Sequence, residues 1–324
     1  MQDIHWGMIG AGDVTEVKSG PAFQKVEGSK LVAVMRRNAE KAEDYAKRHG
    51  IAKWYTNAQE LIDDPEVNAI YIATPPDSHE DYALQVLKAG KAVYVEKPMT
   101  LSSVQAQNMA KAVGESGGKL TVAHYRREQP YFKKIKALLE EKAIGIPRLV
   151  SLRYWRKPLT QEALAETKTQ WRLDPAISGG GLFHDIAPHQ LDLMYYFFGD
   201  VDKAQGIAHN QAKIYPVDDA VAGQILFRNE VLFNGSWLFN ASENSDTCEI
   251  IGSEGKITFS VFSNDPIGLT NQQGKQHFSF EHLAHVQEPM IAAVVAYLQD
   301  KRENPCSASE GFEVMRIIDA FIKQ

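Results

Sequence analysis

The chain has 324 residues, of which 44% are hydrophobic and 23% are charged, and its formal net charge is −6. A chain of this length predicts two domains, and the composition is typical of a globular protein with a sizeable core. The negative charge and the lack of a long basic run argue against nucleic acid as a partner.

Other features of the chain bear on its location. No apolar stretch approaches the roughly 20 residues that span a bilayer, so we expect no membrane partner. The first ten residues, MQDIHWGMIG, lack a basic segment followed by an apolar one, and therefore do not match a signal peptide. Two cysteines, Cys248 and Cys306, are too few for a disulfide framework or a cysteine-based metal site. These observations predict a cytoplasmic protein.

The first predicted element is a buried strand over residues 4–9, which runs into a glycine-rich turn with the sequence GAGDVT. Glycines at the first and third positions of this turn allow a tight bend and close approach to a pyrophosphate. The helix that follows would offer free N–H groups to the same ligand. Thr15 stands where the dinucleotide fingerprint has a third small residue, so we expect slightly looser helix–strand packing there. The candidates for cofactor contact are Gly10, Gly12, Asp13 and Val14.

A second apolar strand, residues 30–35, is followed by Arg36 and Arg37 rather than by the acidic residue that binds ribose hydroxyls in NAD-binding units. Asn38 is a good N-cap for the next helix. Two arginines just before a helix N-terminus oppose its dipole, and a 2′-phosphate would justify them because Arg forms bidentate bonds to phosphate. We therefore prefer NADP(H) to NAD(H), with an exposed basic pair on a loop as the alternative interpretation.

The alternation of strands and helices continues through residue 123. We expect strands at 52–55, 69–73, 92–95 and 119–123, and helices at 58–62, 78–90 and 102–115, with Asp77 and Gly90 capping the helix at 78–90. Such alternation without hairpin signals predicts a parallel sheet with helices on both faces. The predicted first domain is therefore a doubly wound, Rossmann-type dinucleotide-binding domain over residues 1–123.

Several candidate site residues follow the carboxyl ends of these strands, where open α/β sheets bind ligands. Lys97 follows the strand at 92–95, between Glu96 and Pro98, and offers a compact positive charge to a substrate oxygen. The proline excludes the α conformation at Lys97. Taken alone, the tripeptide is a solvated Glu-Lys pair before a loop proline. The clustering with the glycine turn favours a site, whose further candidates are Thr74, Pro75, His79 and Glu96.

The pattern changes after residue 123, and a second domain over 124–324 begins. We expect a helix at 130–142 and a half-buried strand at 147–156. Trp171-Arg172 and three consecutive glycines, 179–181, then precede Asp185 and His189. These two residues share one helix face, and such a pair suits proton transfer. The alternatives are a capping aspartate and a satisfied core histidine.

Two further points concern this helix. Pro188 fits it only within the first turn. A metal site formed by His184, Asp185 and His189 ranks low, because residues five apart point apart on a helix and no other cluster supplies a ligand; we predict no metal.

From about residue 201 the chain is rich in strands, at 217–228, 231–239, 248–252 and 256–261, and it ends in helices at 286–299 and 309–323. Short turns between the strands predict a mostly antiparallel sheet, and hence an α+β substrate domain whose last helix returns to the first domain. Trp237, Phe239 and Phe259 either face outward and pair with a second subunit or pack under the domain's own helices. We expect a homo-oligomer formed through this sheet.

Taken together, GAG at 10–12, EKP at 96–98 and GGG at 179–181 followed by Asp185 and His189 give the chain a resemblance to the Gfo/Idh/MocA oxidoreductases over nearly its whole length. This is the glucose–fructose oxidoreductase and inositol dehydrogenase family. The resemblance implies that Lys97 bonds the substrate oxygen, that His189 exchanges its proton, that Asp185 helps hold the substrate and that Lys97–Pro98 is a cis peptide. It also implies that Trp171 and Arg172 lie near the cofactor.

The sequence departs from the family pattern at three places. Thr15 replaces the third small residue, Arg36 stands where NAD-preferring members carry Asp, and His124-Tyr125-Arg126 replaces a commoner Asn-containing version. The resulting hypothesis is an NADP(H)-dependent oxidoreductase that acts on the CH–OH group of a sugar or polyol-like substrate, with Tyr125, Arg126 and Arg172 shaping the pocket. The alternatives are a glycosidase that retains NAD and a non-enzymatic nucleotide- or sugar-responsive regulator.

Overall fold

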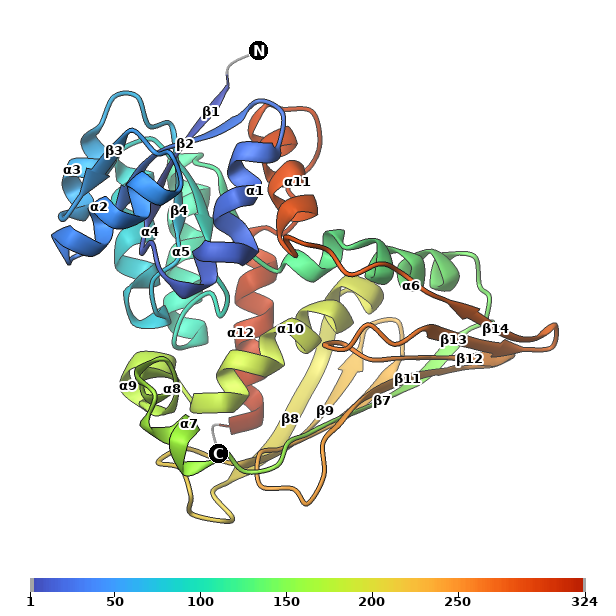
Figure 1. The fold of residues 1–324 in the computed structure, drawn as a ribbon. Coiled ribbons are helices and arrows are strands. Elements are labelled where there is room, and N and C mark those ends of the chain that lie inside the picture. Colours follow the sequence, from blue (N-terminus) through green and yellow to red (C-terminus); the bar gives the residue numbers. More distant parts are fainter. Residues whose placement is uncertain (1–2, 323–324) are drawn as a thin grey trace. The chain divides into compact units, whose positions relative to one another are not determined.

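The computed structural model describes residues 3–322, and the chain divides into two compact units. The first unit comprises Met1–Gln129 with Leu283–Phe312, and the second comprises Pro130–His282 with Glu313–Gln324. Figure 1 colours the chain in sequence order. The division differs from the sequence-based ranges 1–123 and 124–324, because residues 283–312 return to the first unit.

The first unit is built on a six-stranded sheet. Its strands are β1 (Ile4–Ile9), β2 (Ser29–Met35), β3 (Lys53–Tyr55), β4 (Ala69–Ile72), β5 (Ala92–Val95) and β6 (Leu120–Val122). They lie in the order β3-β2-β1-β4-β5-β6, and each neighbouring pair is parallel. The order reverses between β1 and β4, and ligands of open α/β sheets bind at such a switch point. The predicted doubly wound parallel sheet is confirmed.

Helices lie on both faces of this sheet (Figure 1). They are the π-helix η1 (Thr15–Ser19), α1 (Gly20–Lys25), α2 (Ala39–Arg48), α3 (Ala58–Asp63), the 3-10 helix η2 (Pro76–Ser78), α4 (His79–Lys88), α5 (Ser103–Ser116), the 3-10 helix η3 (Tyr125–Glu128) and α11 (Glu288–Leu298). The expected cap at Asn38 is present, since its side chain accepts from the Lys41 N–H at 2.9 Å. Gly90, with φ of 73°, follows the C-cap of α4 as expected. Asp77 lies within η2 instead of capping α4, so that prediction was wrong.

Four aromatic side chains fill the core of the first unit. Trp6, Phe23, Tyr71 and Tyr94 are fully buried, and the rings of Tyr71 and Tyr94 stack with centroids 5.2 Å apart. Burying a phenol without a hydrogen-bond partner is costly, so each hydroxyl needs one inside the core. Their partners are described with the candidate site.

The second unit is built on an eight-stranded sheet. Its strands are β7 (Pro147–Trp155), β8 (Val201–His209), β9 (Ala220–Phe227), β10 (Leu232–Leu238), β11 (Ser245–Gly252), β12 (Gly255–Phe259), β13 (Ile267–Asn271) and β14 (Gly274–Phe278). Their order is β14-β13-β12-β11-β7-β10-β9-β8. Of the strand pairs described, β10 with β7 is parallel and the others are antiparallel. The predicted largely antiparallel sheet is confirmed; β8, β13 and β14 were not among the strands predicted.

Helices cover one face of the second sheet (Figure 1). The helices outside the first unit are α6 (Pro130–Glu140), α7 (Gln161–Ala165), α8 (Thr167–Leu173), α9 (Pro175–Ser178) and α10 (Gly181–Phe198), and the residues of α12 (Ala308–Ile322) are divided between the units. α10 begins at Gly181, so Pro188 lies beyond its first turn, contrary to expectation. Because proline has no N–H, Pro188 cannot donate the usual helical hydrogen bond to the carbonyl four residues earlier.

The aromatic residues considered for a subunit contact instead pack under these helices. Trp237, Phe239 and Phe259 are at most 5% exposed. Trp237 lies between Phe183 of α10 and Phe321 of α12, with ring centroids 5.1 and 6.0 Å away. The outward-facing interpretation was therefore wrong, because the alternation of β10 turns Trp237 toward the covered face.

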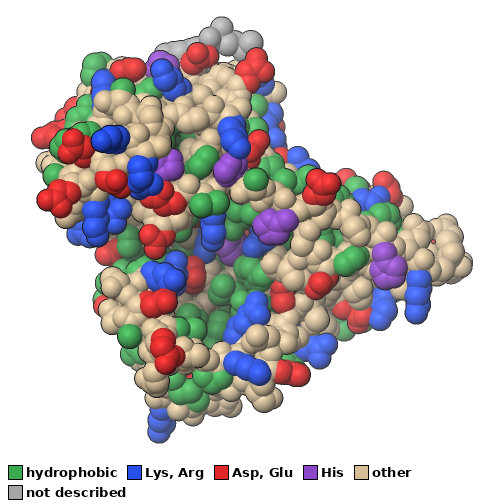
Figure 2. All heavy atoms as spheres, in the orientation of Figure 1, with side chains coloured by type: hydrophobic (Ala, Val, Ile, Leu, Met, Phe, Trp, Pro, Cys, Tyr) green, Lys and Arg blue, Asp and Glu red, His purple; other side chains and the backbone are tan. Residues whose placement is uncertain are grey.

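Two properties of the whole described chain complete the fold. Basic and acidic side chains are interspersed over the face seen in Figure 2. Within residues 3–322, no helix combines the length and the apolar character needed to cross a bilayer.

Candidate functional site

The carboxyl edge of the first unit's sheet holds the glycine turn at its switch point. Gly10 has φ of 94°, and a Cβ there would lie 2.8 Å from the backbone nitrogen of Thr74. Only glycine therefore lets the loops after β1 and β4 approach this closely. A Cβ on Gly12 would meet only the carbonyl oxygen of Gly10, at 3.8 Å, so space remains beside the turn for a ligand.

Thr15 closes this turn. Its hydroxyl accepts from the Gly12 N–H at 3.0 Å and lies 2.8 Å from the Gly12 carbonyl oxygen. The side chain is fully buried, and its carbonyl accepts the hydroxyl of Tyr45 at 3.0 Å. Thr15 thus closes the turn with hydrogen bonds and is the first residue of η1. The remaining candidates of the turn differ in exposure, since Asp13 is exposed and Val14 is half-buried.

Arg36 and Arg37 follow β2 on the same edge. Arg36 is half-buried and Arg37 is exposed. Among residues 3–322, neither guanidinium has a hydrogen bond or ion pair with a side chain. Two neighbouring cations without such partners fit an anionic group, and guanidinium groups pair with phosphate in bidentate fashion. In dinucleotide folds the adenosine ribose is bound at the position after β2, which is where this pair lies.

His79 connects the loops that follow β4 and β5. Its Nε2 lies 2.8 Å from the carbonyl oxygen of Thr74, and its Nδ1 lies 3.0 Å from that of Pro98. The ring is fully buried, and burial lowers its pKa. The structure thus places His79 between two protein loops, where it holds them together. Thr74 and Pro75 are half-buried at the same edge.

The Glu96-Lys97-Pro98 segment follows β5, and its Lys97–Pro98 peptide is cis, as the resemblance implied. Lys97 is half-buried. The Glu96 carboxylate is 7% exposed and accepts the Tyr71 hydroxyl at 2.5 Å and the Gln287 amide at 2.6 Å. Burial, followed by the charge of Glu96, raises the pKa of Tyr71 well above its ordinary value, so the phenol remains a donor.

Tyr125 and Arg126 belong to the first unit, in η3 directly after β6. Tyr125 is 6% exposed, and the guanidinium of Arg126 lies 5.6 Å from its ring centroid. Burial lowers the pKa of the preceding His124 well below its ordinary range. These residues therefore lie at the carboxyl edge, although the sequence assigned them to the second domain.

The second unit positions Asp185 and His189 on α10, with different surroundings. Asp185 is half-buried and pairs with Arg172 of α8, whose Nε lies 3.2 Å from Oδ2. The Arg172 guanidinium also lies 4.3 Å from the centroid of the Trp171 ring. His189 is 6% exposed, and its ring packs edge-on against Phe262 at 5.7 Å. The sequence motifs of this unit thus form one cluster around α10.

Phe262 also lines a cavity of about 250 Å³ in the second unit, together with Arg156, Asn244 and Asp246. Arg156 donates to the Tyr154 hydroxyl at 2.8 Å, and Asp246 accepts the N–H groups of Val261 and Phe262. These residues were not among the site candidates predicted from the sequence. The one available signal was Arg156 at the end of an alternating strand.

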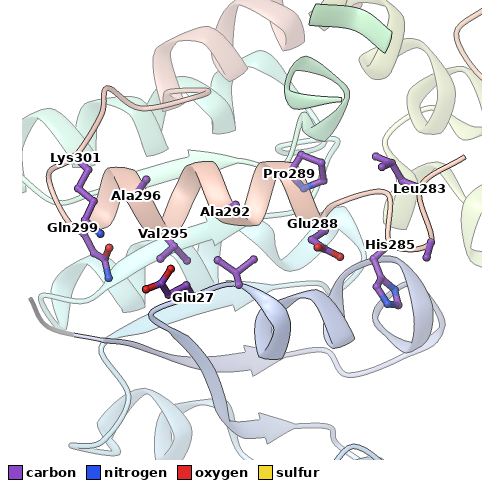
Figure 3. A pocket seen from close by; sticks show the side chains of 12 residues that line it. Glu27, Leu283, His285, Glu288, Pro289, Ala292, Val295, Ala296, Gln299 and Lys301 are labelled. Atoms are coloured by element: carbon purple, nitrogen blue, oxygen red, sulfur yellow. The ribbon is translucent and has the colours of Figure 1, made fainter. Parts of the chain in front are cut away.

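A second cavity, of about 440 Å³, lies in the first unit along α11 (Figure 3). It is lined on one side by α11 and on the other by the turn after α1, which includes Glu27. None of the site residues predicted from the sequence lines it. Within residues 3–322, no group of three His, Cys, Asp or Glu side chains is arranged to hold a metal ion.

Comparisons with known proteins match both halves of the chain. A profile described as "Oxidoreductase family, NAD-binding Rossmann fold" matches residues 4–124, and one described as "GFO/IDH/MocA C-terminal domain" matches residues 132–258. Oxidoreductase P35 of Formosa agariphila is 47% identical over 320 residues, which cover 98% of each chain. A 1,5-anhydro-D-fructose reductase of Ensifer adhaerens is 27% identical over 313 residues, covering 94% of this chain and 91% of the reductase.

Among solved structures, a levoglucosan dehydrogenase in complex with NADH and levoglucosan superimposes with a TM-score of 0.88. The alignment covers 99% of this chain and 96% of the dehydrogenase, at 23% identity. An identity of 23% supports a shared fold and no more. The relationship to a protein family rests on the relative that is 47% identical over 98% of both chains.

Proposed function

This chain belongs to the Gfo/Idh/MocA family of oxidoreductases, and from that premise we propose that it is an NADP(H)-dependent enzyme that interconverts the alcohol and carbonyl forms of a sugar or polyol-like substrate. The observation that carries the proposal is the arrangement at the first sheet's carboxyl edge. There the glycine turn, the arginine pair and Lys97 follow β1, β2 and β5 of one sheet. The glycine turn offers room for the pyrophosphate of the cofactor, the arginine pair binds a phosphate, and Lys97 bonds the substrate oxygen.

The preference for NADP(H) over NAD(H) rests on Arg36 and Arg37. A 2′-phosphate gives two adjacent guanidinium groups a partner that the described chain does not provide. The 2′-hydroxyl of NAD(H) would leave both cations without a phosphate. Further contacts to the cofactor are proposed for Gly10, Gly12, Asp13, Val14, Thr74, Pro75, Trp171 and Arg172. His79 and Glu96 are proposed at the cofactor as well, and the side chains of both also have protein partners.

The substrate class is supported by the names of the relatives. The similar proteins include a 1,5-anhydro-D-fructose reductase and a levoglucosan dehydrogenase, both named for carbohydrate substrates. A sugar or polyol is therefore the proposed substrate class for this chain. Tyr125, Arg126 and Arg172 are proposed to shape its pocket.

The chemistry follows from three side chains. In the reducing direction, bound NADPH supplies a hydride to the carbonyl carbon. Lys97 stabilises the negative charge that grows on the oxygen, and preorganised charge is most effective there. His189 donates a proton to that oxygen, which completes the alcohol and leaves a neutral imidazole. Asp185, oriented by its ion pair with Arg172, holds a substrate hydroxyl. In the oxidising direction each proton movement is reversed.

The proposal is tested by turnover. The purified protein is mixed with NADPH and a panel of keto-sugars, aldoses and keto-inositols, and also with NADP⁺ and the corresponding alcohols, while absorbance of the reduced nicotinamide is followed. We expect oxidation of NADPH with at least one carbonyl of the panel. Hydrolysis of aryl glycosides by protein that retains NAD, without net NADPH turnover, would instead identify the glycosidase alternative. Binding of nucleotide and sugar with neither reaction would support a regulator.

Two further expectations remain proposals. One is self-association through the face of the second unit's sheet that its helices leave uncovered. The other is a cytoplasmic location.

A further inference from the structure

The Glu96 carboxylate is held by donors from three separate parts of the first unit. Oε1 accepts the hydroxyl of Tyr71 from β4 at 2.5 Å and the amide of Gln287 at 2.6 Å. Oε2 accepts the backbone N–H of Lys97 at 3.1 Å. A buried carboxylate is costly unless it is hydrogen-bonded, and these donors satisfy both oxygens. The bond from the Lys97 N–H connects this network of hydrogen bonds to Lys97, the residue proposed to bond the substrate.

Gln287 is fixed in orientation. It is fully buried at the N-cap of α11, and its side chain makes no capping bond to that helix. Its Nε2 donates to Glu96, while its Oε1 accepts the hydroxyl of Tyr94 at 3.1 Å. The amide therefore has one donor and one acceptor partner, and its nitrogen faces the carboxylate. The segment that carries Gln287 thereby braces the loop after β5.

From these contacts we propose that Glu96 and Gln287 are positioning residues that fix the backbone at Lys97, and through it the direction in which the lysine side chain leaves the loop after β5. The inference rests on the proposed function, because it assigns Lys97 the role stated there. The proposal assigns neither side chain a contact with the reacting atoms. Tyr71 belongs to the same network, since its hydroxyl shares Oε1 with the Gln287 amide.

The proposal predicts how two variants change catalysis. Tyr71→Phe removes one donor to Glu96 and keeps the ring, and Gln287→Leu removes the other donor at similar volume. Misplacement of a catalytic group by about 1 Å costs up to roughly 100-fold in rate, so we expect each variant to lower kcat at least several-fold. The Kd for NADPH, measured by fluorescence, should stay close to that of the wild type. Because both donors act on one oxygen, the double variant should lose less than the product of the two single effects.

A matched control separates positioning from loss of stability. Tyr131 is 6% exposed, and its hydroxyl donates to the Asp265 carbonyl at 3.1 Å. Tyr131→Phe also removes a buried hydroxyl, so its unfolding midpoint should fall as in Tyr71→Phe, while kcat should not change. If the network variants keep the wild-type kcat, or if Tyr131→Phe loses kcat in the same proportion to its loss of stability, the proposal is wrong.

A second measurement does not depend on turnover. The rate of acetylation of Lys97 is followed by mass spectrometry relative to Lys111, whose side chain is 72% exposed. We expect this ratio to change in Tyr71→Phe and Gln287→Leu and to stay constant in Tyr131→Phe. An unchanged ratio in the network variants would overturn the positioning role. If the wild type oxidises no NADPH with any sugar while the ratio still changes, the proposed function fails and the positioning role stands.

Discussion

At the scale of single residues, local sequence motifs mark candidate side chains, whereas contacts between distant parts of the chain leave no such mark. Lys97 was predicted because it follows a strand, and Asp185 and His189 because they are four apart on a helix. Tyr71 and Gln287 were missed because they lie 25 and 191 residues from Glu96 in sequence. No local pattern marks such a contact. His79 was expected at the cofactor, and the structure places its two ring nitrogens 2.8 and 3.0 Å from the carbonyl oxygens of Thr74 and Pro98.

The roles of Lys97 and His189 give the first residue-scale prediction. Lys97→Ala removes the charge that stabilises the substrate oxygen, and His189→Ala removes the proton donor. General acid catalysis contributes roughly 10²- to 10⁴-fold, so we expect kcat to fall by about that factor in His189→Ala and comparably in Lys97→Ala. The Kd for NADPH should change little in either variant. Lys111→Ala, on an exposed face, serves as the control. Full activity in both site variants would show that the assigned chemistry is wrong.

At the scale of helices and strands, the alternation of apolar and polar residues predicted most of the elements. It did not predict which face of a sheet packs against which helices. The segments at 4–9, 92–95 and 147–156 were predicted nearly to the residue. Pro188 lies inside α10, because a helix held by its surroundings tolerates a residue that its propensity disfavours. The sequence did not indicate which face of the second sheet the helices cover. The packing of Trp237 against Phe183 and Phe321 shows that they cover the face to which Trp237 points.

The opposite face of that sheet carries two exposed apolar side chains. Ile207 is 67% exposed and Leu232 is 51% exposed. Ile207 pairs with Ala222, which pairs with Ser236 on the strand of Leu232, so the four residues share one face. Exposed apolar side chains on one sheet face are typical of an association surface, and a second copy of the chain is the proposed partner.

Self-association is tested by light scattering. We expect the mass of the wild type to be at least twice the 36.2 kDa of a single chain. Ile207→Glu and Leu232→Glu should lower that mass, because each buries a charge in the contact. Val104→Glu places the same charge on α5 at a residue that is 62% exposed, and it should leave the mass unchanged. A wild type that is monomeric, or a dissociating Val104→Glu variant, would refute association through this face.

At the scale of the whole molecule, the order of motifs predicted the family and the two kinds of sheet, and both were confirmed. The last helix was expected to return to the first domain, but the return of the whole segment 283–312, which includes α11, was not predicted. Arg127 shows why, since its guanidinium binds the Pro305 carbonyl and the Glu310 carboxylate, more than 170 residues away in sequence. The return of this segment depends on tertiary contacts, which the periodicity of hydrophobic residues does not predict. It also brings Gln287 to Glu96, so the candidate site depends on it.

The most direct test of the account is a fluorescence titration of the purified, cofactor-free protein with NADPH and with NADH. Hydrogen bonds to charged groups contribute about 1.5–3 kcal/mol, so we expect NADPH to bind at least roughly tenfold more tightly than NADH. Arg36→Ala and Arg37→Ala should reduce that ratio by weakening NADPH binding and leaving NADH binding nearly unchanged. Equal or tighter binding of NADH by the wild type would contradict the role of the arginine pair. Failure to bind either nucleotide would contradict the oxidoreductase assignment itself.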